Sequence, residues 1–228
     1  MEVRLNTFKF ALLFLFASVS QFSYAQQVTN SPDDDDAVVI VDDKTTREIN
    51  KGSSEYNRIN KNYLVTVQLY GYGPVSGRGV GLTLGKFLDR NSLVLFEGTR
   101  NTSDSEFSST ENIKNYSLGV HFKKYEKNSF YWRMGGDYRT TSFNISNGSS
   151  RAFESESVNF TAAIGNQWYW RSFTLGVDWL GASVPLISKI KSESASGAYT
   201  IASLDDDKKK YTTDTTYIFT RFYVGIAF

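Results

Sequence analysis

The last eleven residues, Ile218 to Phe228, read IFTRFYVGIAF, and this stretch decides the fold. Apolar or small side chains occupy every second position, namely Ile218, Thr220, Phe222, Val224, Ile226 and Phe228. The positions between them are mixed and include Arg221. Successive side chains of a β-strand point to opposite faces, so one face suits lipid and the other suits a polar interior. An apolar strand that finishes on an aromatic ring fits a membrane–water boundary, and the stretch predicts the closing strand of a transmembrane β-barrel.

The same alternation recurs in seven further stretches from Asn62 onward. Each is about 9–11 residues long, the length that a tilted strand needs to cross a bilayer. The residues expected on the lipid face are Tyr63, Val65, Val67, Leu69; Val80, Leu82, Leu84; Val94, Phe96, Gly98; Tyr116, Leu118, Val120, Phe122; Phe130, Trp132, Met134, Gly136, Tyr138; Val158, Phe160, Ala162, Ile164; and Phe173, Leu175, Val177, Trp179.

The connections between these stretches alternate in length. Tight turns are expected near 89–91, 126–128 and 169–171, long external loops at 101–113, 143–156 and 183–213, and one brief outer connection at 73–77. Short periplasmic turns with longer outer loops are typical of outer-membrane barrels. We therefore predict an all-β fold over 61–228, a closed antiparallel up-and-down transmembrane β-barrel of eight strands. Ten strands remain an alternative if 184–190 and 198–204 form a membrane hairpin rather than the preferred external one.

The amino-terminal residues 1–25 have the features of a secretory signal peptide. Arg4 and Lys9 provide a positive start, 10–17 (FALLFLFA) an apolar core, and 23–25 (SYA) a small-x-small cleavage site. The apolar core is too short to cross a bilayer, which takes about 20 helical residues. We expect cleavage before Gln26 and export to the bacterial outer membrane.

Residues 26–60 are polar and acidic, with an aspartate run at 33–36 and a second pair at 42–43. Low hydrophobicity predicts a flexible acidic leader in the periplasm. Two more specific interpretations of this segment remain open. The aspartates could form a cation site, or the short apolar run 37–41 could pair as a strand with a periplasmic partner.

The composition excludes several classes of function. The chain has 25 Lys+Arg and 24 Asp+Glu, and removal of the signal peptide with Arg4, Lys9 and Glu2 leaves equal numbers of each sign. A balanced charge gives no sign of nucleic-acid binding, which favours a basic patch. The cysteine count is 0, so thiolate metal sites and disulfides are excluded. We predict no cofactor and no metal.

The chain resembles the small eight-stranded outer-membrane β-barrel proteins of Gram-negative bacteria, the OmpA/OmpX-like group. The resemblance is one of pattern and covers nearly all of 62–228. It implies that the carboxyl-terminal strand is recognised by the barrel-assembly machinery, with Phe222, Val224, Ile226 and Phe228 as the insertion signal. It also implies contact with outer-membrane lipid and lipopolysaccharide.

Eight-stranded barrels have an interior that side chains fill. Charged residues on the inward faces must pair, because an isolated buried charge is costly. The candidates for an ion-paired core are Glu97, Arg133, Asp137, Arg139, Asp178 and Arg221. The same residues could instead line a narrow conductive path, although bulky side chains in a narrow barrel favour a structural core.

His121 is the only histidine. Some small outer-membrane barrels modify lipid A, and such chemistry needs a base near a serine at the external end. His121 is expected toward the periplasmic half, and Ser117 on the same inner face has no evident acid partner. We therefore predict a histidine of the interior and no enzyme activity.

The preferred function is a structural or surface-interaction role, with a possible ligand at the loops 101–113, 143–156 and 183–213. A small-solute pore is the first alternative, and a lipid A-modifying enzyme is the second. A secreted soluble barrel that binds apolar ligands inside is a third.

Overall fold

The structure, a computed structural model, describes residues 37–42, 45–72, 78–104, 111–146, 150–196 and 205–228. Within these ranges, no helix is long and apolar enough to cross a lipid bilayer. The predicted signal peptide, the aspartate run 33–36 and the brief connection 73–77 lie outside the described residues.

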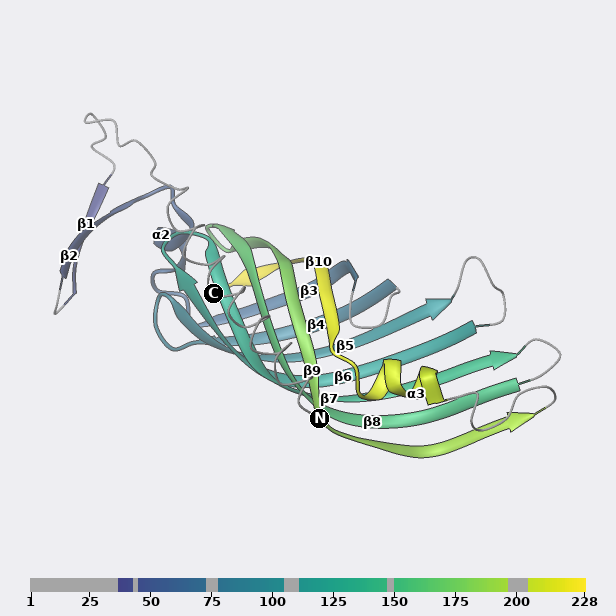
Figure 1. Ribbon diagram of the computed structural model, residues 1–228. Helices are drawn as coiled ribbons and strands as arrows, with labels where there is room; N and C mark the ends of the chain where they lie inside the picture. Colours follow the sequence, from purple (N-terminus) through teal and green to yellow (C-terminus); the bar gives the residue numbers. More distant parts are fainter. Residues whose placement is uncertain (1–36, 43–44, 73–77, 105–110, 147–149, 197–204) are drawn as a thin grey trace. The chain divides into compact units, whose positions relative to one another are not determined.

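Eight strands close into an antiparallel barrel in which neighbours in the chain pair with each other and β10 pairs with β3 (Figure 1). The strands are β3 (Tyr63–Tyr72), β4 (Arg78–Phe87), β5 (Ser92–Asp104), β6 (Glu111–Glu126), β7 (Phe130–Ser146), β8 (Ser150–Trp170), β9 (Phe173–Ser196) and β10 (Thr216–Ala227). The predicted fold class and the count of eight are confirmed, and the ten-strand alternative is wrong.

Side chains alternate between the interior and the outer surface of the barrel. In β3, Leu64, Thr66 and Gln68 are buried, whereas Val67 and Leu69 are exposed on the outside. Leu118 in β6 is 69% exposed. An outer surface of this kind is apolar over a broad area, and the interior is largely polar, as expected for a barrel surrounded by hydrocarbon.

Thr220 interrupts the alternation in β10. Its φ of 46° lies in the left-handed region, and the pairing with β3 shifts between Phe219 and Arg221. A bulge adds one residue to a strand and reverses the facing beyond it. Ile218 therefore points inward with 4% of its surface exposed, and Phe219 lies outside. The prediction that Ile218 shares the lipid face with Phe222 is wrong for this reason.

Strands β6 to β9 continue beyond the ends of β3 and β4 and remain paired with one another (Figure 1). We call this part the extension; it comprises 111–115, 141–146, 150–157 and 184–196. The prediction of loops at 143–156 and 183–213 is wrong for 143–146, 150–156 and 183–196, which are strand. The predicted external hairpin of 184–190 with 198–204 is also wrong for its first half, which pairs with β8. Its second half lies outside the described residues.

An apolar cluster explains why the extension is sheet and not loop. Phe143 and Phe153 are register partners on β7 and β8, and their rings stack with centroids 5.0 Å apart. Ile113 of β6 is buried against them, and Ile145 and Ile190 pack at the edge of the cluster. Alternate inward positions are therefore apolar even though the segments are polar on average.

The remaining predicted loops are described in part. Residues 101–104 belong to β5 and 111–113 belong to β6, so the ends of the predicted loop 101–113 are strand, and 105–110 lie outside the described residues. The helix α3 (Asp205–Thr212) precedes β10. Lys208 Nζ bridges Glu193 Oε2 and Asp205 Oδ1, each at 2.8 Å, and connects α3 to β9.

The predicted leader contains regular structure. Strands β1 (Ala37–Asp42) and β2 (Thr45–Asn50) pair in a two-stranded sheet, and the helix α2 (Ser54–Arg58) follows. Ser53 caps α2, because its hydroxyl accepts a hydrogen bond from the Tyr56 N–H at 3.1 Å. The prediction of a flexible leader is therefore wrong for α2, which is bonded to the barrel as described below.

Candidate functional site in the barrel interior

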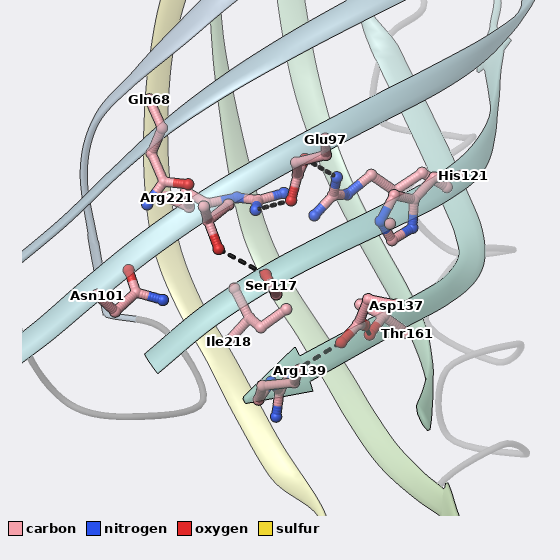
Figure 2. A pocket seen from close by; sticks show the side chains of 13 residues that line it. Gln68, Glu97, Asn101, Ser117, His121, Asp137, Arg139, Thr161, Ile218 and Arg221 are labelled. Atoms are coloured by element: carbon pink, nitrogen blue, oxygen red, sulfur yellow. Dashed lines mark hydrogen bonds and ion pairs between the residues drawn. The ribbon is translucent and has the colours of Figure 1, made fainter. Parts of the chain in front are cut away.

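Four charged side chains form a closed ring across the barrel interior, here called the ion-pair ring. Arg133 Nη1 lies 2.8 Å from Glu97 Oε2, and Arg221 Nη1 lies 2.7 Å from Glu97 Oε1. Asp178 Oδ2 lies 3.2 Å from Arg133 Nη2 and 2.5 Å from Arg221 Nη2. Each carboxylate thus bridges both guanidinium groups, and the four charges sum to zero. Figure 2 shows Glu97 and Arg221 joined across the interior.

The ion-pair ring connects opposite walls of the barrel. Glu97 belongs to β5 and Asp178 to β9, which are four strands apart in the closed order of eight. Arg133 belongs to β7, and Arg221 of β10 is the register partner of Asp178. Because all four side chains point to the barrel axis, they link opposite strands and occupy the centre of the interior.

Two bulges flank the pair Asp178 and Arg221. Besides the bulge at Thr220, the pairing of β8 with β9 shifts between Ile164 and Gly165, which leaves Trp179 without a partner on β8. A bulge changes the direction in which neighbouring side chains point. Both bulges lie next to a charged residue whose side chain points inward.

A layer of tyrosines lies on the turn side of the ion-pair ring. Lys123 Nζ donates hydrogen bonds to Gln167 Oε1 at 2.6 Å and to Tyr223 Oη at 2.9 Å, and it lies 3.4 Å from the centroid of the Tyr131 ring. Tyr131 in turn donates a hydrogen bond to Asp178 Oδ1. Aromatic faces attract cations, so Lys123 is held by rings and neutral acceptors.

A second polar cluster lies on the extension side. Arg139 Nη2 lies 3.3 Å from Asp137 Oδ2 and 2.9 Å from Ser183 Oγ. Asp137 also accepts hydrogen bonds from Asn159 Nδ2 at 3.0 Å and from the Thr161 hydroxyl. This cluster joins β7, β8 and β9 between the ion-pair ring and the start of the extension.

The space left between these groups is small. The cavity in Figure 2 has a volume of about 40 Å³, and a second cavity on the other side of the ion-pair ring has a volume of about 20 Å³. Glu97, Arg133 and Arg221 line both cavities, so the ring lies between them. One water needs roughly 10–15 Å³ by this measure, so each cavity has room for a few waters at most.

The helix α2 closes the turn end of the interior through Arg58, whose exposed fraction is 0%. Arg58 Nε donates to the Arg90 carbonyl at 3.0 Å, Nη1 to the Asn128 carbonyl at 2.5 Å, and Nη2 to the Lys127 carbonyl at 3.0 Å. Its guanidinium carbon lies 3.9 Å from the centroid of the Tyr125 ring. Removal from water lowers the pKa of Arg58 from its usual value, yet arginine stays protonated in proteins.

Three further hydrogen bonds fix the helix on the turns. The Tyr169 N–H donates to Ser54 Oγ at 3.1 Å, and the Arg171 N–H donates to Asn57 Oδ1 at 3.0 Å. The Glu55 N–H donates to Asn128 Oδ1 at 3.1 Å. We call the helix with its inserted Arg58 the α2 plug.

The structure brings the six residues singled out in the sequence into two groups. Glu97, Arg133, Asp178 and Arg221 form the ion-pair ring, and Asp137 with Arg139 forms a separate pair. The sequence did not point to Arg58, which stands in a polar segment without alternation. The only local sign of the α2 plug is Ser53 at the start of the helix, a frequent capping residue.

His121 lines the 40 Å³ cavity together with Glu97 and Asp137. Its Nδ1 has no hydrogen-bond partner among the described atoms. Ser117, the serine on the same strand face, shares a 2.6 Å hydrogen bond with Thr99 Oγ1. The cavity has no room for an acyl chain, so this geometry gives a lipid substrate no access to the imidazole. No group of three or more potential ligands in the described residues could hold a metal ion.

The fold and its closed interior define the class: an eight-stranded antiparallel β-barrel with an apolar outer surface. No protein-family model matches the chain, and no curated protein matches it significantly. A solved structure that is similar is the crystal structure of a major outer membrane protein from Thermus thermophilus, with a TM-score of 0.50 and 11% identity. The match covers 74% of this chain and 99% of that chain. Identity this low supports the likeness of fold alone.

Proposed function

We propose that the chain is an integral outer-membrane protein with a closed interior, and that its role is structural support of the envelope and interaction at the cell surface. The observation that carries the closed interior is the ion-pair ring between two cavities of about 40 and 20 Å³. A conducting pore needs a continuous water-filled path, and bulky paired side chains in an eight-stranded barrel leave little room for one. The small-solute pore is for this reason the weaker candidate.

Placement in the outer membrane is supported by the outer surface of the barrel. Exposed Val, Leu and Phe side chains cover it, and exposed aromatic rings stand near the turn end at Trp170 and Phe173 and near the other end at Tyr217. Amphipathic rings prefer the two interfaces of a bilayer. The signal-like residues 1–25 agree with export. Phe222, Ile226 and Phe228 are exposed on the outside, where the barrel-assembly machinery could contact them.

A role at the cell surface is supported by the extension. β8 has 21 residues and β9 has 24, about twice the roughly 9–11 residues that cross a bilayer. The surplus lies opposite the α2 plug and therefore on the outer side. Exposed side chains of both signs, including Glu154, Lys189 and Lys191, give this surface a polar character suited to a protein or saccharide partner.

Single-channel recording in planar bilayers tests the closed interior. The purified full chain should insert and give no stable conductance above leakage. Reproducible conductance steps would contradict the proposal and favour the pore. Lipid A profiles of cells that carry the wild-type chain or His121→Ala test the enzyme alternative. A modification that disappears only in His121→Ala would establish catalysis.

A further inference from the structure

The outer surface of the barrel carries a shallow apolar groove of about 550 Å³ across β3 to β6. It exists because Gly98 has no side chain. Leu82 and Leu118 are the register partners of Gly98 on either side, and both are exposed. With Val67 and Val80 they form the walls of a notch whose floor is backbone.

One end of the groove is cationic. Arg100 follows Gly98 at the next outward position of β5, toward the extension, and its guanidinium carbon lies 5.7 Å from the centroid of the Tyr116 ring. Lys114 occupies the next outward position of β6 beyond Tyr116 and is exposed. Diagonal neighbours across two strands are about 7–8 Å apart, so one anionic group can contact both. Among the described side chains, neither cation forms an ion pair with a carboxylate.

We propose that the groove binds a phosphorylated lipid of the outer leaflet, specifically the phosphorylated glucosamine lipid that anchors lipopolysaccharide. One acyl chain lies in the notch at Gly98, and one phosphate lies between Arg100 and Lys114. This inference rests on the proposed placement in the outer membrane, which puts the extension and therefore the cationic end on the outer side. A groove on a lipid-facing surface is filled by an acyl chain of some lipid. The two cations favour a lipid whose headgroup is anionic.

A second copy of this chain fits the groove less well. Oligomers usually have closed symmetry, and a two-fold axis along the membrane normal brings the same patch of both copies together. Arg100 and Lys114 of one copy would then face those of the other at the same depth. Like charges at this distance repel, so the cationic end disfavours this occupant.

Native mass spectrometry of the detergent-solubilised full chain, titrated with diphosphorylated lipid A, tests the site. Arg100→Ala should weaken binding about fivefold, the effect of one basic side chain near an anionic lipid. The matched control is Lys124→Ala, an exposed lysine near the turn end of β6. With dephosphorylated lipid A, Arg100→Ala should bind as the wild type does.

A second pair of variants tests the notch. Gly98→Leu fills it, and the new Cβ meets only the flexible end of Leu118 at 3.3 Å. Gly136→Leu is the control, because Gly136 is exposed on β7 and a Cβ there meets the Asn159 carbonyl oxygen at an ordinary 3.7 Å. We expect Gly98→Leu to weaken lipid A binding at least threefold and Gly136→Leu to leave it unchanged.

Three results would overturn the proposal: equal binding by Gly98→Leu and Gly136→Leu, equal binding by Arg100→Ala and the wild type, or a dimer that Gly98→Leu abolishes. Heat-dependent gel mobility shows that each variant is a folded barrel. Insertion of the wild-type chain into vesicles, measured separately, decides the proposed membrane placement. A chain that inserts but shows no difference among the variants therefore refutes the lipid site alone.

Discussion

Replacement of Glu97 by Gln removes one negative charge from the ion-pair ring without changing the size of the side chain. The two carboxylate oxygens accept from different guanidinium groups, at 2.8 Å from Arg133 and 2.7 Å from Arg221. The amide keeps one acceptor oxygen and turns an NH₂ group toward the other donor. Asp178 is then the one carboxylate left to the two arginines in the ring.

The magnitude follows from the burial of the ring. Removal of one partner of a buried pair costs about 3–5 kcal/mol, because the other charge stays buried without compensation. Gln preserves part of one interaction, so we expect Glu97→Gln to lower the free energy of unfolding by about 3 kcal/mol.

Urea unfolding in detergent, followed by tryptophan fluorescence, measures this loss. With a slope of about 1–3 kcal/mol/M, the midpoint should fall by about 1–3 M. Glu126→Gln is the control, since Glu126 is exposed and surface changes usually stay within about 0.5 kcal/mol. A Glu97→Gln midpoint equal to that of the control would refute the reasoning, because it would mean that water in the interior already hydrates the guanidinium groups.

Three further results are expected. Arg58→Ala should lower the free energy of unfolding by about 3 kcal/mol in the same urea titration, because three carbonyls of the turns lose their donor. An unchanged midpoint would mean that the α2 plug does not stabilise the turns. Phe153→Ala should cost about 3–5 kcal/mol of stability within the extension, so limited proteolysis should cut the extension while the barrel stays intact. A variant as resistant to the protease as the wild type would contradict a stabilising role of the apolar cluster. The hydrogen bond from Lys191 lowers the pKa of Glu156, so this pairing is present above the ordinary pKa of Glu and is lost as the pH falls through the lowered value. Carboxyl NMR titration should show this, and Lys191→Ala should move the Glu156 midpoint upward; no movement would contradict the pairing.

The alternation in the sequence was sufficient to predict the barrel, because lipid imposes an apolar face on every crossing strand. Val67, Leu69 and Leu118 are exposed on the outside as this pattern requires. The bulges were not predictable, since the extra residue is not marked by its residue type. Thr220 gave no sign of its left-handed backbone, because β-branched residues seldom adopt it.

The extension and the α2 plug escaped prediction for a different reason. Both consist of segments that are polar on average, and their buried residues are few. Phe143 and Phe153 are separated by a polar stretch in the sequence, and only strand pairing brings their rings together. Arg58 is the least expected residue of the interior, because a charged side chain in an acidic segment normally indicates exposure to water.

The basic side chains on the turn side argue against conduction of cations independently of cavity size. Arg58 lies 3.9 Å from the Tyr125 ring centroid and Lys123 lies 3.4 Å from the Tyr131 ring centroid. No described carboxylate forms an ion pair with either one. A permeating cation would meet these two basic side chains at this end, which disfavours its passage. Tyrosine faces thus compensate the two basic side chains while they fill the interior, and this arrangement supports the proposed closed interior over a cation-conducting pore.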